Sequence, residues 1–339
     1  MLILAIDTTG FSASLALVKD GRRVIFNKIK SGFIPQKNWW DFPYLLPDFH
    51  QKFILKNIKG INWKEIDAIA VSADSGIYTC ILAGVSIAKT LAKIYQKPLI
   101  KVDHLLAHIY SSWIKRDLKD FKFPILVFSA SGSHSDFALI KNKKECEIIY
   151  GAVPKEDKGG IRTFVGIGKV FYQFGKSLGL IAPNDAGVAK FISAASKGKS
   201  DKFNFIKFYQ GELLDLNFSD FVKSIENLLK KQKKLSQKFI NDVAASFQES
   251  ITEILTDKIL KLAKMKKAEE IHIAGGISEN KYLEGKLKNR IKKERLSLIL
   301  RYPVKKQYRL DNAAMIGCLA YYQKKHKIKF NNFKPNITK

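Results

Sequence analysis

The hydrophobic pattern at the start of the chain consists of short apolar runs separated by polar turns. Residues 2–6 are all apolar, residues 14–18 form a second run, and residues 24–29 form a third. Asp20 and Gly21 lie between the second and third runs, and an Asp-Gly pair readily adopts the positive φ of a tight hairpin turn. The pattern predicts a three-stranded antiparallel meander.

The same pattern returns 122 positions later, with apolar runs at residues 125–128, 137–140 and 146–150. At this offset Gly10 falls on Gly132, and residues 16–19 (Ala-Leu-Val-Lys) fall on residues 138–141 (Ala-Leu-Ile-Lys). A repeat of this length predicts two duplicated α/β domains, each opening with strand, small polar loop and strand. The alternative is a chance similarity between two hairpins.

The remaining pattern predicts further strands and helices. Strands are expected at residues 67–72, 99–102 and 271–273, and helices within 75–95 and at 312–323. Phe239, Val243, Phe247 and Ile251 recur at helical spacing, which predicts a long amphipathic helix over residues 239–265. Residues 151–211 are rich in Gly, Lys and Ser and are expected to be irregular, and the lysines of 230–234 are expected to mark an exposed helix end.

The composition is that of a folded protein. Of 339 residues 46% are hydrophobic, which excludes a disordered polycation, and the length suggests about two domains. No apolar run approaches the roughly 18–20 residues of a membrane span, and the first six residues have no basic flank and are expected to form a buried strand, not a signal peptide. Cys80, Cys146 and Cys318 are too scattered for a disulfide framework or a thiolate metal cluster. We therefore expect a cytoplasmic protein.

The net charge of +28 comes from 51 lysines and eight arginines against 31 acidic residues. The positive electrostatic field of such a chain favours binding of nucleic acid, because neutralising phosphates releases counterions. An AT-rich genome alone would also produce many lysines on a solvated surface. Charge alone does not distinguish these two explanations.

Three small polar loops follow predicted strands. They are residues 7–10 (Asp-Thr-Thr-Gly), 131–134 (Ser-Gly-Ser-His) and 274–276 (Ala-Gly-Gly). Small residues let backbone N–H groups approach phosphate oxygens, so these loops are candidates for binding a nucleotide between the two domains. Each alone is equally compatible with an ordinary turn.

A pair of histidines is the most specific candidate for metal chemistry. On a helix His104 and His108 lie one turn apart on the same face, which suits two imidazoles on one transition metal, with Asp103 available as the N-cap. Asp311 is a candidate third ligand, although its position before residues 312–316 also suits an N-cap. The histidines are also compatible with ordinary surface or interface roles.

These motifs together resemble the tRNA adenosine threonylcarbamoyltransferase family, formerly described as O-sialoglycoprotein endopeptidases. The similarity runs in order from Leu2 to about Tyr322. Residues 104–108 (His-Leu-Leu-Ala-His) are similar to the family's His-x-x-x-His metal motif, 131–135 (Ser-Gly-Ser-His-Ser) to its Ser-Gly-Gly-His-Thr loop, 274–280 (Ala-Gly-Gly-Ile-Ser-Glu-Asn) to its nucleotide loop, and 311–316 (Asp-Asn-Ala-Ala-Met-Ile) to the segment that supplies the third metal ligand.

The resemblance implies an α/β fold of duplicated actin/Hsp70/sugar-kinase-like domains with a nucleotide cleft between them. The expected domains are residues 1–118, with the His-x-x-x-His helix, and 119–325, with a helical insertion and a last helix packing back toward the first domain, followed by a basic tail at 326–339. One divalent transition metal, Fe²⁺ or Zn²⁺, is expected at His104, His108 and Asp311. The expected substrate-binding and nucleotide-binding residues are Ser131, Gly132, Ser133, Gly168, Gly179, Gly275, Gly276 and Asn280. No catalytic acid or base is assigned.

The implied reaction moves a threonylcarbamoyl group from threonylcarbamoyl-adenylate to N6 of adenosine 37 in tRNAs that read ANN codons. The expected partners are the tRNA anticodon stem-loop, a subunit of related fold and a small ATPase, with no membrane involved. The metal would act as a Lewis acid and template.

The chain departs from the family pattern at acidic positions. Phe11 and Ser12 stand where relatives carry an Asp-Glu pair, residues 165–173 keep only Gly168 of an acidic motif, and residues 73–76 (Ala-Asp-Ser-Gly) replace an Ala-Gly-Pro-Gly turn. The chain is therefore expected to be the transferase or, alternatively, a metal-binding and tRNA-binding scaffold of the same family without catalysis. A metallopeptidase is disfavoured because no His-Glu-x-x-His pattern is present.

Overall fold

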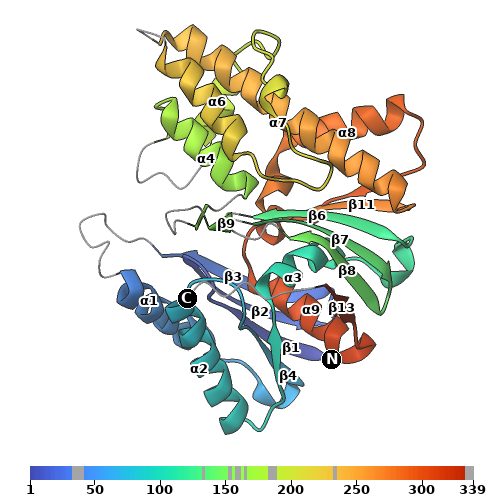
Figure 1. Ribbon diagram of the computed structural model, residues 1–339. Coiled ribbons are helices and arrows are strands. Elements are labelled where there is room, and N and C mark those ends of the chain that lie inside the picture. The colour runs from blue at the N-terminus through green and yellow to red at the C-terminus, as the bar shows by residue number, and fades with distance from the viewer. Residues whose placement is uncertain are drawn as a thin grey trace.

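The computed structural model describes residues 1–32, 42–131, 134–151, 155–156, 162–163, 166–181, 189–231 and 235–332, and it contains two β-sheets with helices around them (Figure 1). The first sheet has the order β3-β2-β1-β4-β5 and the second β12-β11-β6-β7-β8-β13. The first comprises β1 (Leu2–Asp7), β2 (Ser12–Lys19), β3 (Arg23–Ser31), β4 (Ala68–Ser72) and β5 (Leu99–Val102). The second comprises β6 (Ile125–Ser131), β7 (His134–Asn142), β8 (Glu145–Gly151), β11 (Glu270–Ala274), β12 (Ile299–Arg301) and β13 (Lys329–Asn331), and a separate ribbon pairs β9 (Lys155–Glu156) with β10 (Arg162–Thr163).

Helices connect the strands and cover the sheets. The α-helices are α1 (Phe42–Asn57), α2 (Tyr78–Ile94), α3 (His104–Tyr110), α4 (Ile167–Ser177), α5 (Ala189–Ala195), α6 (Ser219–Lys230), α7 (Gln237–Met265), α8 (Lys281–Lys293) and α9 (Ala313–His326). Short 3₁₀ turns are η2 (Trp63–Glu65), η3 (Ser111–Trp113), η4 (Leu118–Asp120), η5 (Ile206–Phe208), η6 (Gly276–Glu279) and η7 (Lys306–Tyr308). Among the described residues, none of these helices combines the length and apolar character that crossing a bilayer requires.

The two sheets repeat one topology. β1 pairs antiparallel with β2 and parallel with β4, and β6 pairs antiparallel with β7 and parallel with β11. In both units a helix follows the fourth strand (α2, α8) and another follows the fifth (α3, α9). The predicted duplication of an α/β unit is therefore confirmed, and chance similarity between two hairpins is excluded.

The helices that end the two repeats lie between the sheets, where they bring the two units together (Figure 1). α9 packs on the first sheet, where an ideal Cβ on Gly317 would lie 2.7 Å from Val18 Cγ2. One buried cluster joins Ile3 and Val18 of the first sheet, Ile125 of the second and Met315 of α9. Burial of this shared apolar surface holds α3 and α9 between the two units, and the candidate metal ligands lie at the starts of these two helices.

The structure corrects the expectation for residues 151–211. Helices occupy 167–177 and 189–195 instead of irregular structure. Ile167, Val170, Phe171 and Phe174 are buried at helical spacing in α4, a signal that the surrounding glycines and lysines obscured. At the other end of the chain, residues 329–331, within the segment expected to be a basic tail, pair with β8 as strand β13.

Candidate metal centre

His104 and His108 project from one side of α3, which begins directly after β5. Asp103 caps the helix, because its Oδ1 accepts a hydrogen bond from the Leu106 N–H at 2.9 Å, while Ser75 Oγ donates to its Oδ2 at 2.9 Å. The cap predicted from the sequence is confirmed. The helix therefore begins at His104. Both imidazoles are buried, with ring centroids 4.8 Å apart and ring planes nearly perpendicular.

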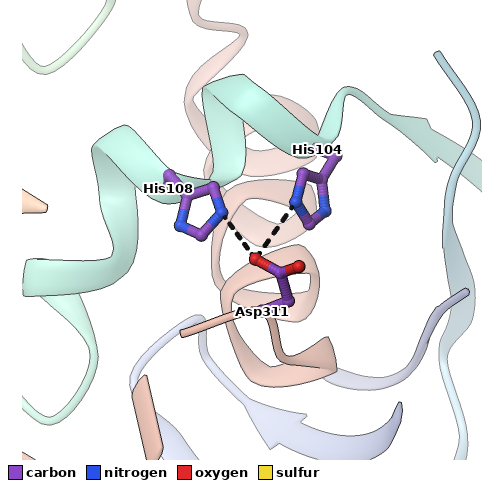
Figure 2. A group of neighbouring side chains, drawn as sticks. All are labelled: His104, His108 and Asp311. Carbon is purple, nitrogen blue, oxygen red and sulfur yellow. Dashed lines mark hydrogen bonds and ion pairs between the residues drawn. The ribbon is translucent and has the colours of Figure 1, made fainter. Parts of the chain in front are cut away.

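Asp311 meets both histidines from the start of α9. Its Oδ1 lies 3.1 Å from His108 Nε2 and 3.5 Å from His104 Nε2 (Figure 2). The helix is capped by Asn312, whose Oδ1 accepts from the Met315 N–H at 3.1 Å. The alternative that Asp311 serves as the N-cap is therefore wrong, and its carboxylate is directed to the histidines instead.

The electrostatics of this cluster suit a cation. Burial opposes ionisation of Asp311, but the charge of His104 and hydrogen bonds from both histidines outweigh it and hold the pKa of Asp311 well below its ordinary value. Burial likewise opposes protonation of His104, but the carboxylates of Asp7 and Asp311 raise its pKa well above the usual range. Two carboxylates thus make the position between the side chains strongly favourable for positive charge.

The donor set fits a divalent transition metal. One ligand atom from each of His104, His108 and Asp311 can be chosen so that all lie within 4.8 Å of one another. Two imidazoles and a carboxylate are typical of iron and zinc sites that leave coordination positions for water or substrate. The Asp311 side chain is 41% exposed, whereas both histidines are buried.

The loop after β11 is shaped by Gly275. Its φ is +74°, and an ideal Cβ there would lie 2.5 Å from the Ala130 carbonyl oxygen, so only glycine allows this approach. Gly276 opens η6 close to the same carbonyl and to Leu310, the residue before Asp311. Both glycines therefore lie beside the end of β6, and Gly276 also lies beside the segment that carries Asp311.

Asn280 has a clear structural role. Its Oδ1 accepts hydrogen bonds from the Tyr282 and Leu283 N–H groups, both at 3.0 Å, and so caps α8. Nucleotide binding by Asn280 stays a prediction.

The other predicted binding residues are Ser131, Gly132, Ser133, Gly168 and Gly179, and the described ones lie at separate places in the fold. Ser131 ends β6, paired with His134, whereas Gly132 and Ser133 lie outside the described residues. Gly168 is exposed in the first turn of α4. Gly179 lies just past the other end of that helix, about 16 Å away by helix rise, and its φ of +69° is typical of the residue that ends a helix. Their roles in binding stay predictions.

The loop after β1 also contributes to the centre. An ideal Cβ on Gly10 would lie 3.5 Å from Asp311 Oδ2, and Thr9 Oγ1 lies 2.9 Å from His104 Nδ1. The sequence predicts residues 7–10 only as a phosphate loop and does not reveal this contact with the histidine. Asp7, which ends an otherwise apolar strand, also lies beside His104, with its Oδ2 3.2 Å from His104 Nδ1. An acidic residue at that position was the available signal, but His104 lies 97 positions further along the chain.

Two comparisons of the sequence agree on one family. Residues 29–318 match the family model of tRNA N6-adenosine threonylcarbamoyltransferase (TsaD). A curated protein of that name from Clostridium perfringens is 32% identical over 331 residues, covering 95% of this chain and 92% of the relative.

Two solved structures share the fold. HypF from T. kodakarensis has a TM-score of 0.62 at 13% identity, covering 96% of this chain and 48% of that one. The component A of Acidaminococcus fermentans (R)-2-hydroxyglutaryl-CoA dehydratase has a TM-score of 0.52 at 14% identity, covering 96% and 98%. At these identities the likeness concerns the duplicated actin/Hsp70/sugar-kinase-like fold alone.

Proposed function

The chain belongs to the tRNA N6-adenosine threonylcarbamoyltransferase family, and on that premise we propose that it transfers a threonylcarbamoyl group from threonylcarbamoyl-adenylate to N6 of adenosine 37 in tRNAs that read ANN codons. The observation that carries the proposal is the cluster formed by His104 and His108 of α3 with Asp311, which directly precedes the N-cap of α9. These three residues carry the family's metal motif in the sequence, and in the fold one ligand atom of each lies within 4.8 Å of the others.

The reaction forms one bond and breaks one. The N6 amine of the adenosine attacks the carbamoyl carbon, the bond from that carbon to the phosphate oxygen breaks, and AMP leaves with the electron pair while the amine loses a proton. Gly275 and Gly276 present backbone beside the end of β6, and Gly276 lies next to Leu310, the residue before Asp311, which suits the phosphate side of the adenylate. His104, His108 and Asp311 would hold a divalent Fe or Zn ion, which when bound supplies Lewis-acid polarisation of substrate oxygens.

One observation favours a second candidate function. Phe11 is 47% exposed, and the sequence predicts that it replaces an acidic residue of the family's Asp-Glu pair. A family member that has lost this carboxylate would suit a scaffold that binds metal and tRNA without catalysing transfer. We also propose that the chain assembles with a related-fold subunit and a small ATPase, as family membership suggests.

Reconstitution separates the transferase from the scaffold. We expect the chain, combined with the synthase that makes the adenylate, the accessory subunits, threonine, bicarbonate, ATP and unmodified tRNA, to yield N6-threonylcarbamoyladenosine detectable by mass spectrometry of the nucleosides. A tRNA with guanosine at position 37 is the matched control and should remain unmodified. Absence of product from the first tRNA, with adenylate supply verified, would favour the scaffold.

Binding of tRNA should depend steeply on salt because of the +28 charge. If about six phosphates are neutralised, affinity should fall by about 10³-fold between about 50 and about 200 mM monovalent salt. Filter binding or fluorescence anisotropy with an anticodon stem-loop would measure this slope. If tRNA binding were absent or insensitive to salt, the many lysines would be explained by genome composition instead.

A further inference from the structure

Asp7 lies directly behind His104, on the side away from Asp311. It ends β1 and is 2% exposed. Its Oδ2 lies 3.2 Å from His104 Nδ1, whereas His104 Nε2 faces Asp311 Oδ1 at 3.5 Å. The imidazole therefore stands between two carboxylates, one at each ring nitrogen.

The two oxygens of Asp7 have different surroundings. Oδ1 accepts hydrogen bonds from Ser72 Oγ at 2.7 Å, from Thr9 Oγ1 at 2.9 Å and from the Thr9 N–H at 3.2 Å. Among the residues that the structure describes, Oδ2 has no hydrogen bond of good geometry, and His104 Nδ1 is the ring nitrogen beside it. One oxygen thus fixes the carboxylate, and the other presents its charge to the imidazole.

The hydroxyl of Thr9 determines where the proton of His104 lies. Thr9 Oγ1 gives its hydrogen to Asp7 Oδ1, so toward His104 Nδ1, 2.9 Å away, it can only accept. With this orientation of the hydroxyl both neighbours of Nδ1 are acceptors, and a proton on Nδ1 satisfies them. When the ring is neutral, as binding of a cation requires, its lone pair is then on Nε2, the nitrogen that faces Asp311.

The loop that carries Thr9 is held firmly. The Ile77 N–H donates to the Thr9 carbonyl oxygen at 2.7 Å, and Thr8 Oγ1 donates to the Cys80 carbonyl oxygen at 2.8 Å. Gly76 permits the contact, since an ideal Cβ there would lie 2.3 Å from the Thr9 oxygen. The acceptors behind His104 are thus fixed by backbone contacts that do not depend on the imidazole.

We propose that Asp7, acting with Thr9, is a positioning residue that holds His104 as an Nε2 donor to a divalent transition cation. A carboxylate behind a ligating imidazole fixes the ring and raises its basicity, and removing such a partner lowers metal affinity about 10–100-fold. His108 lacks an equivalent, because its buried Nδ1 has no hydrogen-bond partner among the described residues. His104 is therefore the pre-oriented ligand of the pair. This inference rests on the metal centre of the proposed function.

The test compares Zn²⁺ affinity, measured by competition with a chromophoric chelator, in the full chain and two matched variants. Asp7→Asn should bind Zn²⁺ about 10–100-fold more weakly than the wild type. Asp242→Asn is the control: it removes a similarly buried carboxylate whose partners are Lys199 and Lys238 instead of a histidine, and it should leave the affinity unchanged. Equal affinity for Asp7→Asn and the wild type would overturn the inference and leave the metal centre intact. Failure of the wild type to bind Zn²⁺ would overturn both.

A measurement on the wild type needs no variant. Nitrogen-15 NMR of the Zn²⁺-loaded protein, labelled at its six histidines, should show His104 with a metal-bound Nε2 and a protonated Nδ1. A metal-bound Nδ1 would contradict the inference even if Asp7→Asn failed to fold. Circular dichroism of both variants checks that lost affinity is not lost structure.

Discussion

Replacing Asp311 by alanine should lower Zn²⁺ affinity by at least about 100-fold and abolish transfer to tRNA. Loss of a partner behind a ligand costs about 10–100-fold, and Asp311 is itself a candidate ligand whose Oδ1 is 3.1 Å from His108 Nε2. Because Asn312 provides the cap of α9, the helix should still form. The loss should therefore be specific to the metal centre.

The measurements are metal content after dialysis, chelator competition and the reconstituted transfer assay. Asp117→Ala is the matched control, because Asp117 is also a half-exposed carboxylate in an ion pair, with Arg22, and is 42% exposed. It should bind Zn²⁺ and transfer threonylcarbamoyl as the wild type does. If Asp311→Ala retained wild-type metal content, the assignment of the three ligands would be wrong.

The strands and the duplication could be predicted because their signals are local. Apolar runs bounded by Gly-containing turns reveal β1 and β2 directly, and the offset from Gly10 to Gly132 reveals the second unit. The mixed composition around α4 hid a helix that tertiary burial stabilises. α1 was not predicted, and Pro47 within it is a residue that normally argues against a helix.

The metal ligands could be predicted only in part from local pattern. The spacing of His104 and His108 indicates a shared helix face, but the preference for Asp311 as a cap or a ligand depends on which residue begins α9. The contact of Asp7 with His104 depends on how β1 lies against α3, and no sequence spacing contains that information. The capping role of Asp103 could be predicted, because a cap involves contacts only within its own helix.

A second buried cluster lies beyond the end of α3. Ser112 Oγ is 2.7 Å from His272 Nδ1, and His272 Nε2 is 2.9 Å from Glu270 Oε2. The order of groups is that of a hydrolytic triad. However, all three residues have 0% exposure, so a substrate has no access, and the cluster instead ties η3 to β11. Arg301 completes it, donating to Glu270 Oε2 at 2.6 Å and to Oε1 at 3.0 Å.

Glu270→Gln should destabilise the protein by about 3 kcal/mol at neutral pH. Removing one partner of a buried ion pair leaves the other charge uncompensated, which costs about 3–5 kcal/mol. Arg301 would lose its carboxylate, and His272 would lose the charge that accepts from its Nε2. Urea unfolding followed by circular dichroism measures the difference. Glu294→Gln is the control, because its pairs with Lys264 and Arg290 are near the surface and should contribute less than about 1 kcal/mol.

The effect of Glu270 should fade in acid. Burial opposes its ionisation, but hydrogen bonds from His272 and Arg301 outweigh burial and lower the pKa of Glu270 to about 2. Since the pKa is lower in the folded state than in the unfolded state, the stabilisation is complete above the ordinary glutamate pKa and is lost as pH falls toward the folded value. The difference in unfolding free energy between wild type and Glu270→Gln should therefore shrink between about pH 5 and about pH 2.5. A difference that stays constant over this range would mean that the charge of Glu270 does not hold η3 against β11.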